Sequence, residues 1–128
     1  MGRVLVIDDE PNLRMVLELA LSGAGHEALI AENGLKGLEK LNEGYKPDVI
    51  LVDLNMPKLS GKDFVMELRK NPHYNDISIL ILSGSMPGTG EFPPKDTYQG
   101  IVSKPFDLNE LLDLTESLCR SNEFLSVS

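Results

Sequence analysis

The sequence predicts an α/β fold in which helices cover both faces of an open, doubly wound, five-stranded parallel sheet. Two observations lead to this prediction. Short apolar runs without polar alternation, typical of strands buried on both faces, alternate along the chain with amphipathic stretches of helical spacing. The chain has 128 residues, of which 41% are hydrophobic, and this length suits one compact domain with its own core. Strands that alternate with helices form right-handed crossovers, which build a parallel sheet.

Five segments are expected to form the strands. Three of them consist mostly of β-branched residues and leucine, and two are weaker because they contain glycine or polar residues. The strong segments are residues 3–7, 49–52 and 77–82, and the weaker ones are residues 26–31 and 100–103.

Four amphipathic helices are expected around these strands. In the first, Leu13, Leu17 and Leu21 recur at helical spacing, Pro11 suits a first helical turn, and Gly23 suits a helix end. The others are expected over residues 35–44, over residues 64–71, and from Leu108 to Cys119 with Asp107 as the N-cap.

The balance of charge and the single cysteine limit the partners and the compartment. Twenty acidic against twelve basic side chains leave a net charge of −8, which repels nucleic acid and anionic lipid. We therefore expect a protein or a cation as the partner, and no direct binding of nucleic acid. Cys119 has no second cysteine to pair with, which fits a reducing compartment. Because no apolar run reaches the roughly 18 residues that span a bilayer, and no signal-peptide pattern is present, the sequence predicts a cytoplasmic protein without membrane association.

Polar residues end four of the expected strands. Asp8 and Asp9 follow the first strand, Asp53 the third, Ser83 the fourth, and Lys104 the fifth. The carboxyl ends of parallel strands meet at one edge of the sheet, and this edge carries the functional crevice of such folds. We therefore expect these five side chains to lie in a common crevice.

This set of side chains suits phosphoryl transfer assisted by a divalent cation. Neighbouring carboxylates raise one another's pKa unless a cation neutralises them, and hard oxygen ligands at an open site suit Mg²⁺. We expect Asp8 and Asp9 to hold the ion and Asp53 to act as a carboxylate nucleophile that becomes an aspartyl-phosphate. Lys104 and the Ser83 hydroxyl are expected to stabilise the transferred group.

Each of these residues also has a plain structural interpretation. Asp8 and Asp9 suit a polar strand end, with Asp9 capping the helix that starts near Pro11. Asp53 suits a turn, Ser83 a local hydrogen bond to the backbone, and Lys104 a solvated charge. Their combination at one sheet edge favours the site.

Four short motifs, in order and at fitting spacing, make the chain similar to a known family. They are Val6-Ile7-Asp8-Asp9-Glu10-Pro11, the stretch DVILVDLNMP at residues 48–57 with Ser60-Gly61 following, Ser83, and Lys104-Pro105-Phe106. On these residues the chain resembles the receiver domains of two-component response regulators, such as chemotaxis regulators, over residues 3–119.

The resemblance implies a flavodoxin-like fold with strand order 2-1-3-4-5 and Mg²⁺-dependent transfer of a phosphoryl group to Asp53. The donor would be a phosphohistidine of a sensor histidine kinase or phosphotransfer protein. Ser83 and Lys104 would bind the phosphate, and the metal ligands would be Asp8, Asp9, Asp53 and the backbone carbonyl of Asn55. The chain would be no enzyme beyond its own phosphorylation and dephosphorylation, and Lys104-Pro105 would be a cis peptide.

The sequence departs from the family pattern in two places. Residues 84–100 contain Pro87, Pro93, Pro94 and several glycines, and a proline inside a helix costs about 3 kcal/mol. The fourth helix of the family is therefore expected to be short, irregular or absent, with at most a turn near Pro87 or over residues 95–99. Ile101 occupies the position of the family's aromatic switch, so we expect the signal to take another route, such as ordering of residues 84–100.

We expect a receiver domain over residues 3–120, followed by a tail or the start of a linker at residues 121–128. Its partners would be the kinase or phosphotransfer protein and an output domain or downstream protein. A second copy would contact the face made by residues 100–103 and the last helix. An alternative is an interaction module that works without phosphorylation. A Mg²⁺-dependent phosphohydrolase is disfavoured because Asn55 stands where such enzymes commonly carry a second aspartate.

Overall fold

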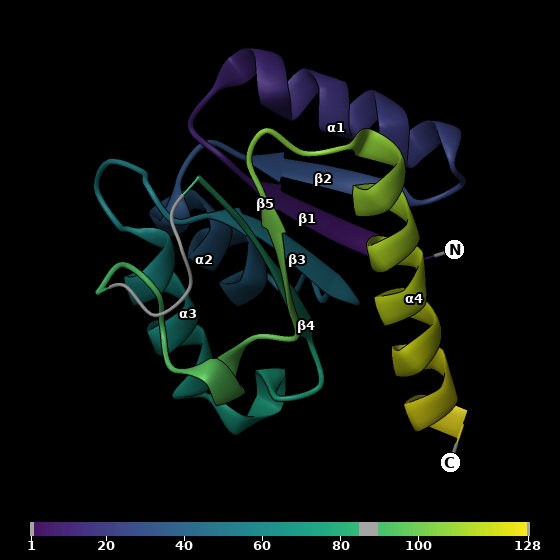
Figure 1. The fold of residues 1–128 in the computed structure, drawn as a ribbon. Coiled ribbons are helices and arrows are strands. Elements are labelled where there is room, and N and C mark those ends of the chain that lie inside the picture. Colours follow the sequence, from purple (N-terminus) through teal and green to yellow (C-terminus); the bar gives the residue numbers. More distant parts are fainter. Residues whose placement is uncertain (1, 85–89, 128) are drawn as a thin grey trace.

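The computed structural model describes residues 2–84 and 90–127, and of residues 121–127 the backbone alone. Within these residues five parallel strands form one sheet in the order β2-β1-β3-β4-β5, which confirms the expected fold and strand order (Figure 1). The strands are β1 (Arg3–Ile7), β2 (Glu27–Ala31), β3 (Val49–Asp53), β4 (Ser78–Ser83) and β5 (Gly100–Ser103).

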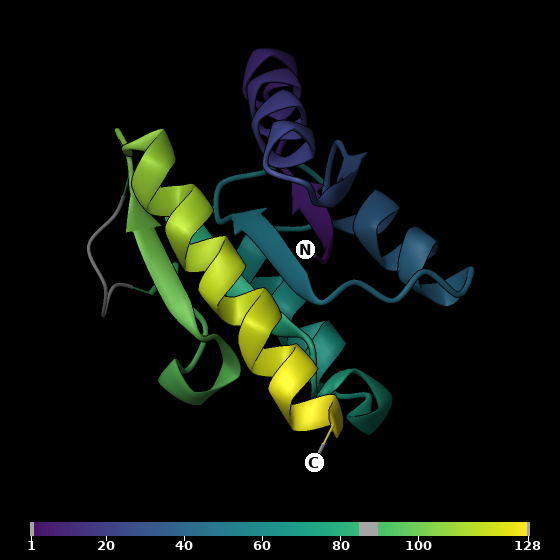
Figure 2. The same ribbon diagram turned by 90° about the vertical axis from the view of Figure 1, so that its right-hand side faces the viewer.

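Helices cover both faces of the sheet, as expected (Figures 1 and 2). Leu17 of α1 and Leu111 of α4 pack with Val4 and Leu51 on one face, whereas Phe64 of α3 belongs to the core on the other. Among the described residues no helix is long and apolar enough to cross a membrane. The helices are α1 (Pro11–Gly23), α2 (Gly34–Asn42), α3 (Gly61–Arg69) and α4 (Leu108–Val127).

Local signals set most of the helix ends. The Asn33 side chain accepts a hydrogen bond from the backbone N–H of Lys36 at the start of α2, and Asp107 accepts one from Asn109 at the start of α4. The last helix is longer than expected, because α4 continues past Cys119 to Val127. No glycine or proline interrupts this part of the sequence, so nothing in it ends the helix at residue 120.

The described part of the segment between β4 and β5 contains one short 3₁₀ helix, η2 (Lys95–Thr97), and no α-helix. This agrees with the expected loss of the family's fourth helix. The turn expected near Pro87 lies outside the described residues. A second 3₁₀ helix, η1 (Pro72–Tyr74), precedes β4 and was not expected.

Arg69, at the end of α3, ties this irregular segment to the rest of the fold. Its guanidinium donates hydrogen bonds to the backbone carbonyl oxygens of Thr97 at 2.9 Å, Tyr74 at 3.0 Å and Ile77 at 2.9 Å. It also donates to the side-chain oxygen of Gln99 at 3.2 Å. Burial lowers the pKa of Arg69, with the Asp76 carboxylate acting in the opposite direction. One side chain thus fixes η1, the start of β4 and η2 against α3.

Candidate functional site

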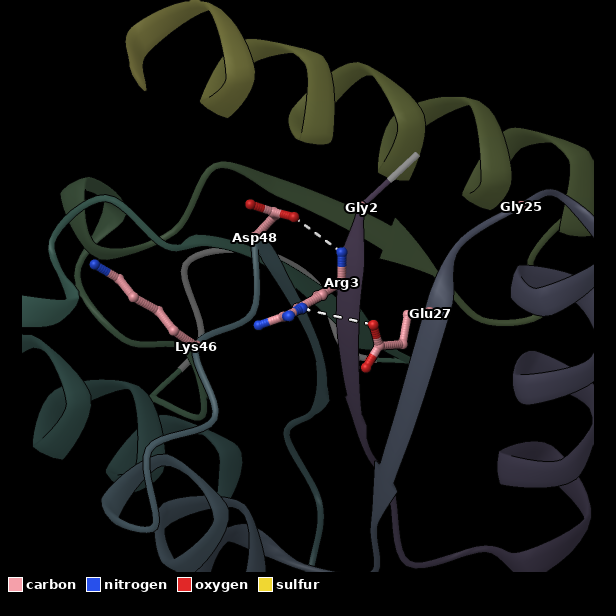
Figure 3. Close-up of a pocket in the computed structure, with 6 residues that line it drawn as sticks. All are labelled: Gly2, Arg3, Gly25, Glu27, Lys46 and Asp48. Atoms are coloured by element: carbon pink, nitrogen blue, oxygen red, sulfur yellow. Dashed lines mark hydrogen bonds and ion pairs between the residues drawn. The ribbon is translucent and has the colours of Figure 1, made fainter. Parts of the chain in front are cut away.

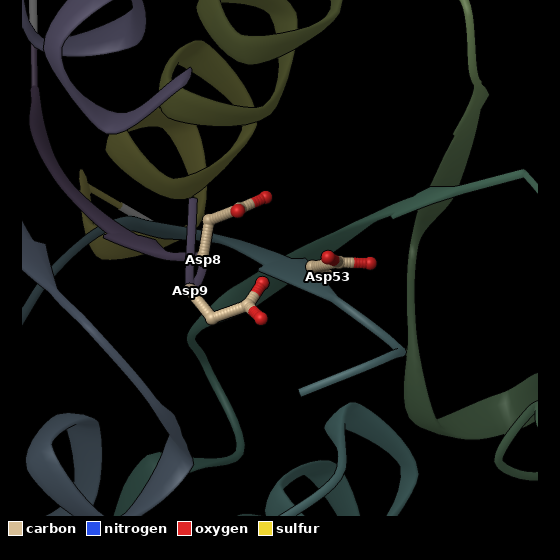
Figure 4. Close-up of side chains that lie close together, drawn as sticks. All are labelled: Asp8, Asp9 and Asp53. Atoms are coloured by element: carbon tan, nitrogen blue, oxygen red, sulfur yellow. The ribbon is translucent and has the colours of Figure 1, made fainter. Parts of the chain in front are cut away.

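Three carboxylates meet at the carboxyl edge of the sheet, as the strand ends predicted. Asp8 follows β1, Asp9 comes next in the chain, and Asp53 is the last residue of β3. One oxygen from each lies within 4.8 Å of the others, and Figure 4 shows the side chain of Asp9 directed toward Asp53, with Asp8 above it. Asp8 and Asp53 are buried, whereas Asp9 is exposed, so the cluster opens to solvent on one side.

Lys104 brings a positive charge to this cluster from the end of β5. Its Nζ lies 3.3 Å from Asp53 Oδ2 and 3.7 Å from Asp8 Oδ2. The Lys104 side chain is 30% exposed, so it bridges the buried carboxylates and the solvent. The peptide bond Lys104-Pro105 is cis, as the resemblance implied.

Asp8 combines burial with a neighbouring carboxylate. Burial raises its pKa, the hydrogen bond from the backbone N–H of Glu10 at 2.8 Å lowers it, and the neighbouring Asp53 carboxylate raises it again. Asp8 Oδ2 is buried, and no described group donates a hydrogen bond to it. A buried oxygen without a hydrogen-bond donor beside two further carboxylates is a costly arrangement that the ammonium of Lys104, 3.7 Å away, offsets in part and that a hard divalent cation would relieve. The donor set of carboxylate oxygens therefore fits Mg²⁺.

Asp53 is held in place by the turn that follows β3. Its Oδ1 accepts a hydrogen bond from the backbone N–H of Asn55 at 3.2 Å, which leaves Oδ2 facing Lys104. The same turn needs glycine at residue 61, because a Cβ there would collide with the carbonyl oxygen of Asp53 and lie 2.7 Å from the Cα of Leu54. Gly61 also donates its N–H to the Leu54 carbonyl at 2.9 Å. The start of α3 is thereby packed directly beneath Asp53.

Ser83 and Asn55 lie close to the cluster in the fold. Ser83 ends β4, the strand next to β3, and its side chain is fully buried. The backbone N–H of Lys104 donates to the Ser83 carbonyl at 2.7 Å, so the two strand ends are linked. Asn55 is exposed two residues beyond Asp53.

The structure also adds Arg14, which sequence reasoning missed. From α1 its guanidinium donates to the backbone carbonyl of Asp8 at 2.8 Å and fixes the loop that carries the acidic pair. No sequence signal marks this role, since an arginine on the first turns of a helix is usually solvated. The structural interpretation of Asp9 as a cap is not supported, because Glu10 is the N-cap of α1 and no side chain caps that end.

A second hollow lies at the opposite end of the sheet, where β1 and β2 begin (Figure 3). Each of its charged side chains has a partner, inside the hollow or beside it. Arg3 Nε lies 3.5 Å from Glu27 Oε2, and the backbone N–H of Arg3 donates to Asp48 Oδ2 at 2.9 Å. Lys46 lies 3.3 Å from Asp76. A hollow whose charges are already satisfied is a weak candidate for a ligand site.

Comparison with known families finds a match over most of the chain. The family model described as the response regulator receiver domain matches residues 4–116. Among solved structures, the chemotaxis response regulator CheY4 of Vibrio cholerae is 30% identical, with a TM-score of 0.83 over 92% of this chain and 98% of that one. The response regulator TrrA of Thermotoga maritima, solved in complex with Mg²⁺ and BeF, is 32% identical, with a TM-score of 0.79 over 92% of this chain and 99% of that one.

Curated relatives fall into two kinds. The DNA-binding transcriptional regulator RpaA of Synechocystis is 32% identical over 130 residues, which cover 96% of this chain and 51% of that protein. The chemotaxis protein CheY1 of Helicobacter pylori is 32% identical over 124 residues, which cover 94% of this chain and 99% of that protein. The chain therefore spans about half the length of some relatives and the full length of others.

Proposed function

The chain belongs to the response regulator receiver domain family, and on this premise we propose that Asp53 accepts a phosphoryl group. The donor is a phosphohistidine of a sensor histidine kinase or a phosphotransfer protein, or a small phosphodonor. The observation that carries the proposal is the pair of contacts made by Lys104. Its ammonium group lies within 4 Å of both Asp53 and Asp8. Asp9 belongs to the same cluster of carboxylates.

The chemistry uses groups of this chain that are already in position. An oxygen of the Asp53 carboxylate attacks the phosphorus atom, a P–O bond forms, and the P–N bond to the imidazole breaks with its electron pair going to the nitrogen. The backbone N–H of Asn55 orients the Asp53 carboxylate through Oδ1. Lys104 then binds an oxygen of the aspartyl-phosphate, and the Ser83 hydroxyl, at the adjacent strand end, is proposed to bind another.

Asp8, Asp9 and Asp53 are the side chains that would hold Mg²⁺, with the backbone carbonyl of Asn55 as a further proposed ligand. The ion, when bound, supplies positive charge against the phosphoryl oxygens and against the three clustered carboxylates. The buried Asp8 Oδ2, to which no described group donates a hydrogen bond, supports this assignment.

We further propose that residues 3–120 form the receiver unit in the cytoplasm and that residues 121–128 lead toward an output domain or a downstream protein. Apart from its own phosphorylation and dephosphorylation, the unit turns over no substrate. The face of β5 and α4 is proposed for contact with a second copy, which sedimentation velocity before and after phosphorylation tests directly.

Intact mass spectrometry tests phosphoryl acceptance. The chain is incubated with Mg²⁺ and acetyl phosphate, alongside Asp53→Asn and the control Asp113→Asn, which removes an exposed carboxylate on α4. We expect the mass of one phosphoryl group on the wild type and on the control, and none on Asp53→Asn. Wild type without an adduct, with acetyl phosphate and with a phosphorylated kinase alike, would refute the proposal.

A second candidate function is an interaction module that works without phosphorylation. Two observations favour it: η2 replaces a regular fourth helix in the described part of the segment, and Ile101 stands where the family carries an aromatic switch. The absence of an adduct, combined with phosphorylation-independent partner binding, would favour this function over the first.

A further inference from the structure

A groove opens between α3 and the segment that takes the place of a fourth helix, away from the acidic cluster. Its volume is about 410 Å³, within the range of ligand pockets. The segment packs against α3 through η2, and both lie on the same side of the sheet in Figure 1. The groove is lined by Lys62, Met66, Phe92, Pro93, Pro94, Lys95 and Tyr98.

The walls of the groove are apolar and held in shape. The rings of Phe92 and Tyr98 lie 6.3 Å apart in a tilted arrangement, and Phe92 is 7% exposed as part of the core. Met66 on α3 is 41% exposed, so its side chain offers apolar surface to a partner at the groove. The Arg69 guanidinium fixes the backbone of η2 through Thr97, so the two walls keep their spacing.

The charges at the groove are opposite in sign to the charge of the chain. Among the described lining residues, Lys62 and Lys95 are the charged ones, although the chain as a whole carries −8. Lys62 Nζ donates to the backbone carbonyl of Gly90 at 3.1 Å, which holds it at the rim. The nearby carboxylates of Glu91 and Asp96 are exposed and are not part of the lining.

We propose that this groove binds an acidic linear segment of a partner protein, with one bulky apolar side chain inserted between Met66 and the Phe92–Tyr98 pair. Carboxylates flanking that side chain pair with Lys62 and Lys95. This inference rests on the second candidate function, the interaction module, and gives the chemical class of its partner. It requires no phosphoryl transfer to Asp53. A second copy is not the proposed occupant, because the face proposed above for a second copy is that of β5 and α4.

Selection from a library of random twelve-residue peptides displayed on phage tests the proposal on the unphosphorylated full chain. Bulk charge by itself favours basic peptides, so enrichment of acidic ones is a specific signature. We expect enriched peptides to carry a net negative charge and a bulky apolar residue. A representative synthetic peptide, followed by fluorescence anisotropy, should lose at least tenfold in affinity on Lys62→Glu/Lys95→Glu and on Met66→Glu. It should bind unchanged to Lys36→Glu/Lys40→Glu, which makes the same charge change on α2.

Several outcomes would overturn the proposal. The selection would do so by enriching neutral or basic peptides or by enriching none. Binding would do so if Lys36→Glu/Lys40→Glu lost as much affinity as the groove variants. A wild-type dimer that the groove substitutions abolish would also do so, because a second copy would then occupy the groove. Circular dichroism and urea midpoints confirm that each variant folds. Because labelling of Asp53 is measured separately on the same variants, failure of the groove proposal and failure of the phosphoacceptor proposal give different results.

Discussion

Lys104 Nζ lies 3.3 Å from Asp53 Oδ2, although the two residues come from strands that are separated in the sheet by β4. The lysine reaches across the end of β4 and also comes within 3.7 Å of Asp8 Oδ2. A single ammonium group therefore offsets part of the repulsion within the acidic cluster, and it is positioned to meet negative charge added to Asp53.

Replacing Lys104 tests this second role. We expect Lys104→Met to lower the rate at which acetyl phosphate labels Asp53 by about tenfold or more, because one charged contact to the transferring group is lost. Intact mass followed over time in excess Mg²⁺ measures the rate. Lys46→Met, which removes a lysine at the opposite end of the sheet, should label at the wild-type rate. Equal rates for both variants would show that Lys104 does not act on the phosphoryl group.

Asp8→Asn should stabilise the metal-free chain. Because burial raises the pKa of Asp8, the folded chain keeps its proton to higher pH than the unfolded chain, whose group titrates near 3.8. The free energy of unfolding contributed by this group is thus fully present below pH 3.8 and falls as the pH rises through the folded pKa. At pH 7 in EDTA, urea unfolding of Asp8→Asn should give a higher free energy of unfolding than wild type.

The same substitution should remove the response to the metal. We expect Mg²⁺ to raise the unfolding midpoint of wild type by binding the folded state, and Asp8→Asn to lose most of this increase. Asp113→Asn serves as the control and should behave as wild type in both conditions. A destabilised Asp8→Asn in EDTA, or an unchanged Mg²⁺ response, would contradict the electrostatic account of the cluster.

Arg69→Ala should destabilise the fold by about 3 kcal/mol, because the carbonyl oxygens of Thr97, Tyr74 and Ile77 lose a charged donor. Arg69→Lys should recover little of this, since one ammonium group cannot reproduce the planar fork. Urea unfolding measures both, with Lys70→Ala, an exposed neighbour, expected within about 0.5 kcal/mol of wild type. If Arg69→Lys proves as stable as wild type, the fork geometry is unimportant.

Gly61→Ala should impair both stability and phosphorylation. The added methyl group meets the Asp53 carbonyl and the Leu54 Cα, so the turn beneath the phosphoacceptor must move. We expect the free energy of unfolding to fall by about 2 kcal/mol or more, and Asp53 to be labelled more slowly. Gly23→Ala adds the same methyl group where no atom lies within 4 Å, and should label normally. Normal labelling of Gly61→Ala would mean that the turn tolerates displacement.

Much of the fold follows from patterns that lie close together in the chain. The strand of residues 3–7 and the helix between Pro11 and Gly23 match the expectation, because buried β-branched runs and helix-end residues are local signals. The predicted end of α4 was wrong because the apolar stripe weakens after Cys119. No helix-stopping residue follows there, and the helix continues to Val127. The Arg69 network was missed because its acceptors lie up to 30 residues away in the sequence.

The alternation of strands and helices follows from the sequence alone. It also predicts the edge at which Asp8, Asp9, Asp53 and Lys104 gather, because parallel strands all end on the same side. The electrostatic interactions among these groups depend on the folded structure. Three features depend on distances and burial between remote segments: the buried Asp8 oxygen without a hydrogen-bond donor, the reach of Lys104 across β4, and the lysine-rimmed groove beside α3. Such quantities arise from packing of the whole chain, and no local pattern encodes them.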